Sequence, residues 1–311
     1  MALCRDQVFV PEGAKPLPAT FRVLITRYNV ARPGFRARAG ISNAAEHRRW
    51  LDERLKLFKS FCLPSVLKQT MQPDLWALGL DGDEREAVQP VLDAVRSYPW
   101  IVPAWQERQG ESHETEAQSF ARVIVPRVMH DHSHVMLTRV DNDDSLGREY
   151  LSYASVYAAA VRARNPALDD FWICFPFGAD YFERRCWVWV YPGNPFLSRV
   201  QTRERFLERQ VYWVEHTKVL RPNYPLFLPL TTEPMWLRNF HGGNVKPNRF
   251  GGRLRFVPTN EVLRNFGVEL RELDAAGVGT SDWRAGAKRA SRRIAKRVRR
   301  ALRRLQSSSA R

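Results

Sequence analysis

Three carboxylates stand close together at Asp141, Asp143 and Asp144, directly after the apolar run Val135–Val140. Neighbouring carboxylates repel one another unless a cation or solvent screens them. Mg²⁺ and Mn²⁺ prefer oxygen ligands, and Mg²⁺ typically shares one or two carboxylates with phosphate oxygens. Residues 141–144, which we call the acidic loop, therefore predict a metal–diphosphate site. The alternative is a solvated turn that caps the next helix.

A histidine followed by two glycines stands 100 residues after Asp141, at His241. Glycines allow the backbone to approach a ligand closely. A neutral imidazole can complete the ligand set of Mn²⁺ or contact a phosphate. The pattern allows a role for His241 at a metal or diphosphate, although by itself it favours a structural histidine in a glycine turn.

Apolar runs and helical patterns alternate four times through the first half of the chain and must position these residues. Asn43 and Thr115 each precede a Glu or Gln by three residues, which is the pattern of a helix-starting capping box. The alternation predicts a parallel sheet covered by helices on both faces, with ligands beyond the carboxyl ends of the strands. The expected strands are 21–25, 75–80, 100–105 and 135–140, and the expected helices are 43–61, 84–98, 115–129 and 148–162.

The second half of the chain changes character. Its apolar runs at Phe171–Pro176, Cys186–Tyr191 and Val211–Val219 resemble strands separated by turns. A parallel first half followed by a β-rich second half predicts a mixed α/β fold with a topological break. The expected fold class is therefore α/β, a Rossmann-like parallel or mixed sheet flanked by helices.

Composition excludes several classes of protein. The 311 residues are 44% hydrophobic, which allows a sizeable core. No apolar run approaches the roughly 18 residues of a membrane-spanning helix, and residues 1–20 lack the apolar segment of a secretory signal. The four cysteines are scattered without a CxxC pair, which suits a reducing cytosol.

The positive charge is concentrated at the C-terminus. The chain has a net charge of +16, and residues 284–311 hold 12 Lys and Arg without any Asp or Glu. The rest holds 37 basic and 33 acidic residues, a net charge of +4. Because the main body is nearly neutral, nucleic-acid binding by the whole protein is disfavoured.

The basic C-terminal segment also has an apolar stripe. A spacing of three or four residues predicts a basic amphipathic helix over 284–305, which is typical of binding to an anionic membrane surface. Contact with RNA and a solvated, partly disordered tail are the alternatives. The stripe consists of Ala290, Ile294, Val298, Leu302 and Leu305.

Four segments occur in an order that resembles a known family. They are ITRYNV at 25–30, WLDERLKLFKSFCLPSVLKQT at 50–70, TRVDNDDSLG at 138–147 and WLRNFHGGNV at 236–245. Over roughly residues 20–250 they resemble the bacterial family described as "putative rhamnosyl transferase". The resemblance implies a GT-A fold and a glycosyltransferase that uses a nucleotide-sugar donor, with deoxythymidine-diphosphate rhamnose as the expected sugar nucleotide.

The resemblance also implies roles for individual residues. Asp141, Asp143 and Asp144 would bind Mg²⁺ or Mn²⁺ as a DxD motif, and His241 would contact the metal or the diphosphate. The residues expected to bind the donor are Thr26, Arg27, Tyr28, Asn29, Asp81, Arg139, Asp141 and Asn244.

A mechanism follows from this metal site. The cation stabilises the negative charge that grows on the departing diphosphate. Arg139 would add a fixed positive charge, or else pair with the acidic loop. An inverting enzyme needs a carboxylate to take the acceptor proton. Glu233 is the candidate and Asp180 the second choice, with a structural role as the alternative for each.

The expected organisation has four parts: an irregular arm at 1–20, a GT-A-like domain at 21–262, a connecting segment at 263–283 and the basic tail at 284–311. The expected acceptor is a glycan or a lipid-linked molecule, and the expected location is the cytoplasmic face of the membrane. A basic-tailed nucleic-acid-binding protein and a metal-dependent phosphohydrolase remain as alternative functions.

Overall fold

The structure is a computed structural model of the 311-residue chain. It describes residues 8, 10–31, 34, 36, 39–182, 184–211, 215–221, 223–241, 255–257 and 259–275. Asn244, the two glycines after His241 and the basic tail lie outside the described residues. The predictions made for them stay predictions.

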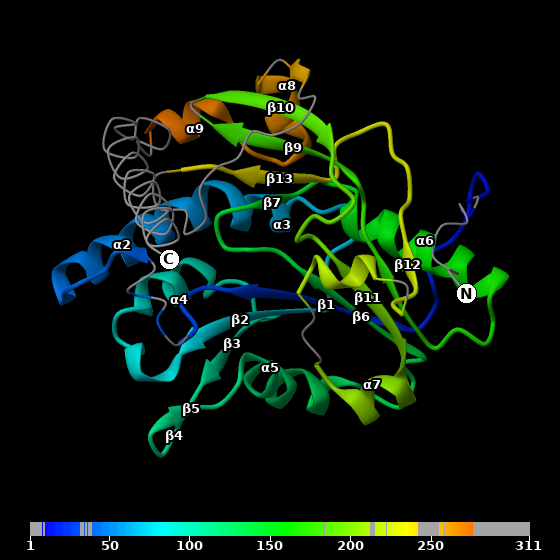
Figure 1. The fold of residues 1–311 in the computed structure, drawn as a ribbon, viewed down its shortest axis with the longest axis horizontal. Coiled ribbons are helices and arrows are strands. Elements are labelled where there is room, and N and C mark those ends of the chain that lie inside the picture. Colours follow the sequence, from blue (N-terminus) through cyan, green and yellow to red (C-terminus); the bar gives the residue numbers. More distant parts are fainter. Residues whose placement is uncertain are drawn as a thin grey trace, which may run out of the picture.

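A seven-stranded sheet forms the centre of the protein, in the order β12-β8-β11-β6-β1-β2-β3 (Figure 1). Strands β6, β1, β2 and β3 run parallel, whereas β11 is antiparallel to both of its neighbours. The expected parallel half with a topological break is confirmed. The strands are β1 Thr20–Arg27, β2 Leu75–Asp81, β3 Ile101–Gln106, β6 His134–Arg139, β8 Asp170–Ile173, β11 Ser198–Thr202 and β12 Leu226–Phe227.

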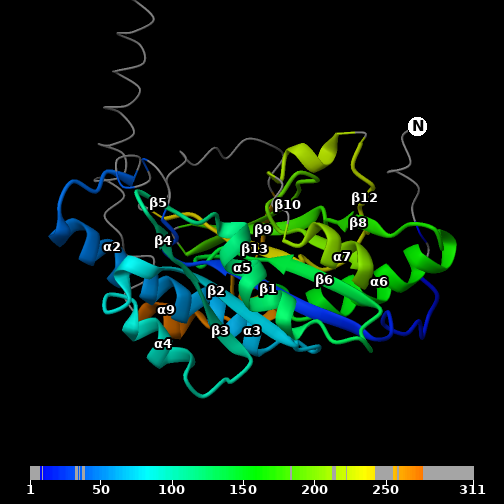
Figure 2. The ribbon, with the colours of Figure 1, turned by 90° about the horizontal axis from the view of Figure 1, so that it is seen from below.

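Helices cover both faces of this sheet, as the alternating pattern predicted. Helices α5 and α7 pack on one face, seen in front of the sheet in Figure 2, and α2, α3, α4 and α6 pack on the other. The α-helices are α2 Ala44–Leu57, α3 Leu63–Leu67, α4 Gln89–Val95, α5 Glu116–Ile124, α6 Tyr150–Arg164 and α7 Arg203–Arg209. A π-helical turn (η1, Phe58–Cys62) joins α2 to α3, and 3₁₀ turns lie at η2 Gly82–Glu84, η3 Val125–Arg127 and η4 Lys218–Leu220.

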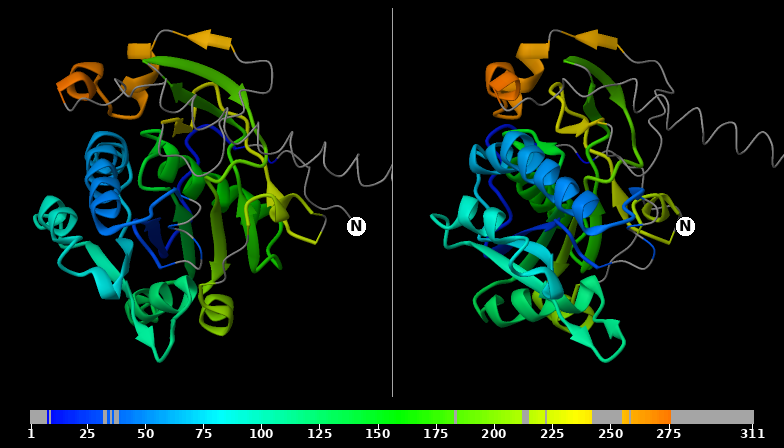
Figure 3. Two further views of the ribbon diagram at one scale, coloured as in Figure 1. Left: turned by 60° about the vertical axis from the view of Figure 1, so that its left-hand side comes forward. Right: turned by 90° about the vertical axis from the view of Figure 1, so that its left-hand side faces the viewer.

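A second sheet, in the order β14-β10-β9-β13-β7, lies on the far side of α2 and α3 (Figures 1 and 3). Leu57 and Phe61 pack against this sheet together with α8, so the C-terminal end of α2 and the turn η1 lie between the two sheets. The elements are β7 Ser145–Leu146, β9 Phe177–Phe182, β10 Arg185–Val190, β13 Trp236–Asn239, β14 Arg255–Val257, α8 Thr259–Asn265 and α9 Leu270–Ala275. A hairpin of β4 Arg108–Gln109 and β5 Ser112–His113 stands apart from both sheets.

The predicted caps begin the helices that carry the site. Asn43 Oδ1 accepts a hydrogen bond from the backbone N–H of Glu46 at 2.9 Å and so caps α2. The Glu46 carboxylate reaches Ser42 rather than Asn43, so the second half of that capping box is displaced by one residue. Thr115 and Gln118 form the full capping box at α5. These side chains satisfy backbone N–H groups that no helical carbonyl can reach.

The predicted strand over Val211–Val219 is wrong within the described residues, because Lys218–Leu220 forms a 3₁₀ turn. Strand β11 was missed although it lies inside the large sheet. Its sequence, SRVQT, has polar residues at buried positions. Arg199 is buried because it pairs with Asp170 on the neighbouring β8, so the strand carries no apolar alternation.

Two of the predicted domain boundaries, at residues 20 and 262, can be compared with the described elements. Residues 10–19 form neither helix nor strand, and the backbone N–H of Leu17 donates to the Ser155 carbonyl of α6 at 3.1 Å. Helix α8 crosses the boundary predicted at residue 262 and packs on the second sheet. Among the described residues, no helix combines the length and apolar character needed to cross a bilayer.

Candidate functional site

The carboxyl ends of β1, β2, β3 and β6 meet at one edge of the large sheet. The chain passes from β1 outward to β2 and β3, and then returns to β6 on the other side of β1. The order of strands therefore reverses between β1 and β6. Ligands in open α/β sheets bind at such a switch point, beyond the carboxyl ends of the strands. The acidic loop follows β6 at this position, and Arg27 ends β1 beside it.

Arg27 and Asp141 bridge the switch point. Arg27 Nη2 lies 2.8 Å from Asp141 Oδ1, and Nη1 lies 4.0 Å from Glu116 Oε2 of α5. Burial acts to lower the pKa of Arg27, but the charges of these carboxylates raise it above its ordinary value. The Asp141 side chain keeps 40% of its surface exposed. This carboxylate is therefore the solvent-facing member of the acidic loop.

Asp143 is enclosed by two partners from distant parts of the chain. Arg54 Nη1 of α2 lies 2.5 Å from Asp143 Oδ2, and His241 Nε2 lies 2.9 Å from the same oxygen. Burial alone would raise the pKa of Asp143, but the Arg54 charge and the His241 contact hold it below its ordinary value. The structure thus places His241 beside the acidic loop, 98 residues away in sequence. Its role as a ligand stays a prediction.

Asp144 and Asn142 turn inward and hold the acidic loop in place. Asp144 is buried, and its Oδ1 accepts the backbone N–H of Asn239 at 2.9 Å. Burial raises the pKa of Asp144 well above its ordinary value, and the charges of Asp143 and Asp141 add to this effect. Asn142 donates to the Tyr28 carbonyl at 2.8 Å.

The residue types of the acidic loop and His241 suit a hard divalent cation, but no three of these described residues have ligand atoms that all lie within 4.8 Å of one another. Three carboxylates and one imidazole supply the oxygen and nitrogen ligands that Mg²⁺ and Mn²⁺ accept. Their ligand atoms face separate partners: Asp141 faces Arg27, Asp143 faces Arg54 and His241, and Asp144 faces the β13 backbone. A cation at Asp143 Oδ2 would compete directly with the guanidinium of Arg54.

A second group that could hold a metal lies after β2. Among the described residues, ligand atoms of Asp81, Asp83 and His113 all lie within 4.8 Å of one another. His113 Nε2 is 3.6 Å from Asp81 Oδ1 and 3.1 Å from Asp83 Oδ2. Arg108 donates two hydrogen bonds to Asp83 Oδ2, at 2.9 and 2.7 Å. A metal here would therefore share that oxygen with a guanidinium, as at Asp143.

The pKa values of the two carboxylates in this second group shift in opposite directions. Burial raises the pKa of Asp81, although the backbone N–H of Asp83 opposes the change. The Arg108 hydrogen bonds lower the pKa of Asp83. The sequence predicted Asp81 as a donor-binding residue and did not predict its association with His113, which comes from the β4–β5 hairpin.

Of the residues expected to bind the nucleotide-sugar donor at the end of β1, some lie in the core and others at the edge of the sheet. Thr26 is fully buried, and its hydroxyl accepts the Trp76 Nε1 hydrogen bond at 2.9 Å. Tyr28 is buried with its ring edge-on to Phe58. Asn29 instead joins the two strand ends, because its Oδ1 accepts the backbone N–H of Asp81 at 3.1 Å.

Arg139 ends β6 beneath the acidic loop, and its Nε donates to the Pro195 carbonyl at 2.8 Å. Burial lowers the pKa of Arg139 to about 10, and the nearby charge of Arg27 contributes. At neutral pH Arg139 is still a cation. It therefore adds positive charge at the switch point while its Nε is held by backbone.

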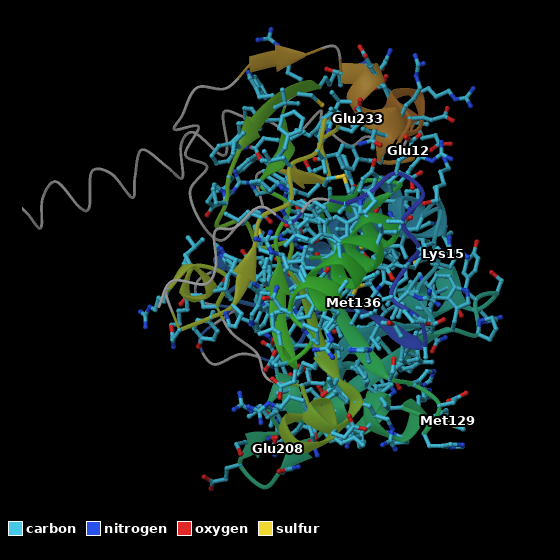
Figure 4. All side chains as sticks on the ribbon, turned by 90° about the vertical axis from the view of Figure 1, so that its right-hand side faces the viewer. Glu12, Lys15, Met129, Met136, Glu208 and Glu233 are labelled. Carbon is cyan, nitrogen blue, oxygen red and sulfur yellow. The ribbon has the colours of Figure 1, made fainter. Side chains whose placement is uncertain are left out.

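The two candidate general bases lie on the second sheet. Asp180 of β9 is buried and accepts two hydrogen bonds from Arg238, both at 3.0 Å. Burial raises the pKa of Asp180 despite this pairing. Glu233 is exposed, near α8 in Figure 4, and it precedes β13, whereas His241 follows that strand. The two residues therefore flank opposite ends of β13.

Sequence reasoning missed Arg54, although a signal for it exists. Leu51, Arg54 and Phe58 are spaced by three and four residues, so Arg54 occupies the apolar face of α2. All three are buried. A charged residue on such a face requires a partner. Asn142 and His113 were missed because their partners come from distant segments of the chain.

Comparisons with known proteins identify a family. The family described as "putative rhamnosyl transferase" matches residues 22–253, about three quarters of the chain. A search of curated proteins returned no match.

Two solved structures resemble the chain weakly. A 4-diphosphocytidyl-2C-methyl-D-erythritol synthase from Anaerococcus prevotii is 10% identical, with a TM-score of 0.33, covering 69% of this chain and 88% of that one. An inositol-1-phosphate CTP transferase from T. maritima is 12% identical, with a TM-score of 0.37, covering 71% and 90%. These scores are too low to transfer an activity. The family match over residues 22–253 shows that the chain belongs to the putative rhamnosyl transferase family.

Proposed function

We propose that this protein is a metal-dependent glycosyltransferase that moves a sugar, with rhamnose as the family suggests, from a nucleotide-diphosphate donor to a glycan or lipid-linked acceptor. Family membership supports a transferase. The observation that carries the proposal is the meeting of Asp143 and His241 at the switch point between β1 and β6, with Asp141 and Asp144 in the same loop. This position suits a diphosphate.

The chain's own residues supply the binding of the donor. Asp141, Asp143, Asp144 and His241 would hold Mg²⁺ or Mn²⁺, which supplies Lewis-acid stabilisation of the departing diphosphate. Arg27 and Arg139 add positive charge at the same edge of the sheet. The nucleoside would bind beyond β1 and β2, where Asn29 and Asp81 are joined by a hydrogen bond. The charge that grows on the leaving group therefore develops within a cationic setting.

We infer that the acceptor binds beside the second sheet. Asp180 is tied to Arg238, which also lies over the rings of Phe240, Trp189 and Tyr191. Aromatic rings of this kind suit stacking against a sugar. Asp180 lies beside Arg238 in the register of β9 and β13, and Arg238 stands three residues before His241, so we infer that Asp180 rather than Glu233 is the carboxylate nearer to an acceptor.

We place the protein at the cytoplasmic face of the membrane, bound to anionic lipid through residues 284–305. The support is the sequence of that segment, with 12 Lys and Arg and no acidic residue in 284–311. Attraction of about 1 kcal/mol for each basic residue near an anionic surface is enough for several residues to act together. A lipid-linked acceptor would then be concentrated beside the enzyme.

The test is a screen of nucleotide sugars for thermal stabilisation, with and without Mn²⁺. A ligand that binds only the native state raises the apparent stability by an amount that grows with its concentration over its Kd. Stabilisation by a deoxythymidine-diphosphate sugar that requires Mn²⁺ supports the proposal. Incubation of the donor with Mn²⁺ that releases sugar 1-phosphate and nucleoside monophosphate, rather than nucleoside diphosphate, would instead support a phosphohydrolase.

A further inference from the structure

Arg54 is a buried arginine of α2 that reaches the acidic loop from the helix layer between the two sheets. Only 9% of its side-chain surface is exposed. Its Nη1 donates to Asp143 Oδ2 at 2.5 Å and to Asn142 Oδ1 at 3.2 Å. Its guanidinium carbon also lies 5.2 Å from the centre of the Trp50 ring. These three contacts with described residues join the guanidinium to one charged group and to two neutral ones.

The charged partner of Arg54 is the oxygen that a cation would need. Asp143 Oδ2 already meets Arg54 and His241. A divalent cation coordinated by that oxygen would repel the guanidinium and take over the negative charge that balances it. Arg54 would then lose the Asp143 carboxylate that balances its charge, and for a buried cation this loss costs free energy unless another anion takes that place.

The two neutral contacts limit how far the Arg54 guanidinium can move if it leaves Asp143. The Asn142 amide oxygen and the Trp50 ring carry no net charge, so a cation at Asp143 does not compete for them in the same way. They keep the guanidinium at the acidic loop, next to the switch point where a diphosphate would lie. A planar guanidinium fork matches phosphate oxygens and binds them in pairs.

We propose that Arg54 exchanges partners: it neutralises Asp143 in the ligand-free protein, and it binds the donor diphosphate once a divalent cation has taken that carboxylate. This inference rests on the proposed function and deepens it, because it makes the binding of cation and diphosphate cooperative. The cation alone must displace Arg54 without giving it a new anion. The cation together with a diphosphate provides that anion.

A single substitution, Arg54→Gln, should change the affinity for Mn²⁺ and the affinity for the nucleotide in opposite directions. Arg54→Gln removes the competitor for Asp143, so Mn²⁺ alone should bind more tightly, by about threefold or more. The same variant loses the fork that holds the diphosphate, so deoxythymidine diphosphate in saturating Mn²⁺ should bind at least about tenfold more weakly. Because coupling between two ligands is reciprocal, the enhancement of Mn²⁺ affinity by the nucleotide should fall by the same factor as the enhancement of nucleotide affinity by Mn²⁺.

The experiment is a set of calorimetric titrations of the full chain with Mn²⁺ alone, and with deoxythymidine diphosphate in saturating Mn²⁺. Arg54→Lys retains the charge without the planar fork and should show a smaller gain in Mn²⁺ affinity with a similar loss of nucleotide affinity. Arg22→Gln is the matched control, because Arg22 forms a bidentate pair with Asp74 near the opposite end of β1. It should change neither affinity. Circular dichroism establishes that each variant is folded, and Arg54→Lys serves alone if Arg54→Gln is not.

The outcomes separate this inference from the proposed function. Suppose first that Asp143→Asn abolishes Mn²⁺ binding, which supports the metal site. If the Arg54 variants then bind Mn²⁺ more weakly than the wild type does, the exchange of partners by Arg54 is wrong. The exchange is also wrong if these variants bind the nucleotide as tightly as the wild type does. If Asp143→Asn binds Mn²⁺ as tightly as the wild type does, the metal site at the acidic loop is wrong and the exchange falls with it.

Discussion

Asp144 Oδ1 accepts the backbone N–H of Asn239 at 2.9 Å, which ties the acidic loop after β6 to the end of β13. Asn239 lies two residues before His241. Both Asp144 and Asn239 are buried. This hydrogen bond acts together with the pairing of β7 with β13 to align the two segments whose side chains meet at Asp143, and it gives Asp144 a positioning role that does not depend on a metal.

The role of Asp144 can be separated from its charge. Asp144→Asn keeps an oxygen that can accept the Asn239 N–H, whereas Asp144→Ala removes it and leaves a buried donor unsatisfied. Such a loss costs about 1–3 kcal/mol. We expect Asp144→Ala to speed hydrogen exchange of the Asn239 amide, measured by NMR without metal, and Asp144→Asn to preserve its protection. Equal protection in both variants would contradict the positioning role.

Two candidate metal positions can be distinguished by matched substitutions. We expect Asp143→Asn to abolish Mn²⁺-dependent binding of a nucleotide diphosphate and sugar transfer, and Asp83→Asn to leave the metal requirement intact. Asp143 is enclosed by Arg54 and His241, whereas Asp83 is largely exposed and already satisfied by Arg108. Calorimetry with Mn²⁺ and a transfer assay measure both. The reverse result would move the metal to the group of Asp81, Asp83 and His113.

The raised pKa of Asp180 gives a pH dependence with a defined sign. Burial raises the pKa of Asp180 in the folded state, so the native protein binds its proton more tightly than the unfolded chain does. The contribution to the free energy of unfolding is therefore fully present below about pH 3.9, the unfolded value, and is lost as pH rises through the folded value.

Denaturant titrations of the wild type and Asp180→Asn test this dependence. The unfolding free energy of the wild type minus that of the variant should decrease from about pH 4 upward, by at most about 1.4 kcal/mol per pH unit. A difference that increases over the same range would mean that Arg238 dominates and that the folded pKa lies below its ordinary value.

Gly178 tests the packing that supports β13. A Cβ at Gly178 would lie 2.0 Å from Cε2 of Trp236, which is fully buried and donates its Nε1 hydrogen bond to the Phe175 carbonyl at 2.9 Å. We expect Gly178→Ala to lower the free energy of unfolding by about 1–3 kcal/mol or more, because the ring cannot move freely. The double variant Gly178→Ala, Trp236→Leu should lose less unfolding free energy than the sum of the losses in the two single variants, as expected for residues in contact.

The basic tail gives a prediction that does not depend on the fold. Removal of residues 284–311 should release the protein from anionic vesicles while transfer to a soluble acceptor analogue survives. The basic residues and the apolar stripe from Ala290 to Leu305 would supply the attraction and the insertion. Vesicle co-sedimentation measures it, and raised salt should weaken binding of the full chain. Equal sedimentation of the full and shortened chains would exclude the tail as the membrane contact.

The sequence by itself determined the parallel half of the fold and the place of the acidic loop. Apolar runs such as Leu75–Leu80 alternate with capped helices, and this local periodicity requires a covered parallel sheet. The end of a strand is a local property, so the position of Asp141–Asp144 beyond β6 followed from the sequence. The charge of the basic tail is likewise independent of tertiary structure.

The tertiary structure decided which side chains meet. Arg54 reaches Asp143 across 89 residues, and His241 reaches it across 98, because α2 and β13 pack on either side of the acidic loop. The direction of Thr26 into the core, toward Trp76, also depends on the neighbouring strand. Contacts between distant segments depend on strand order and packing, and no local pattern encodes them. Strand β11 shows the same limit, because its buried Arg199 is stabilised by Asp170 and by the ring of Trp172, both on the adjacent strand β8.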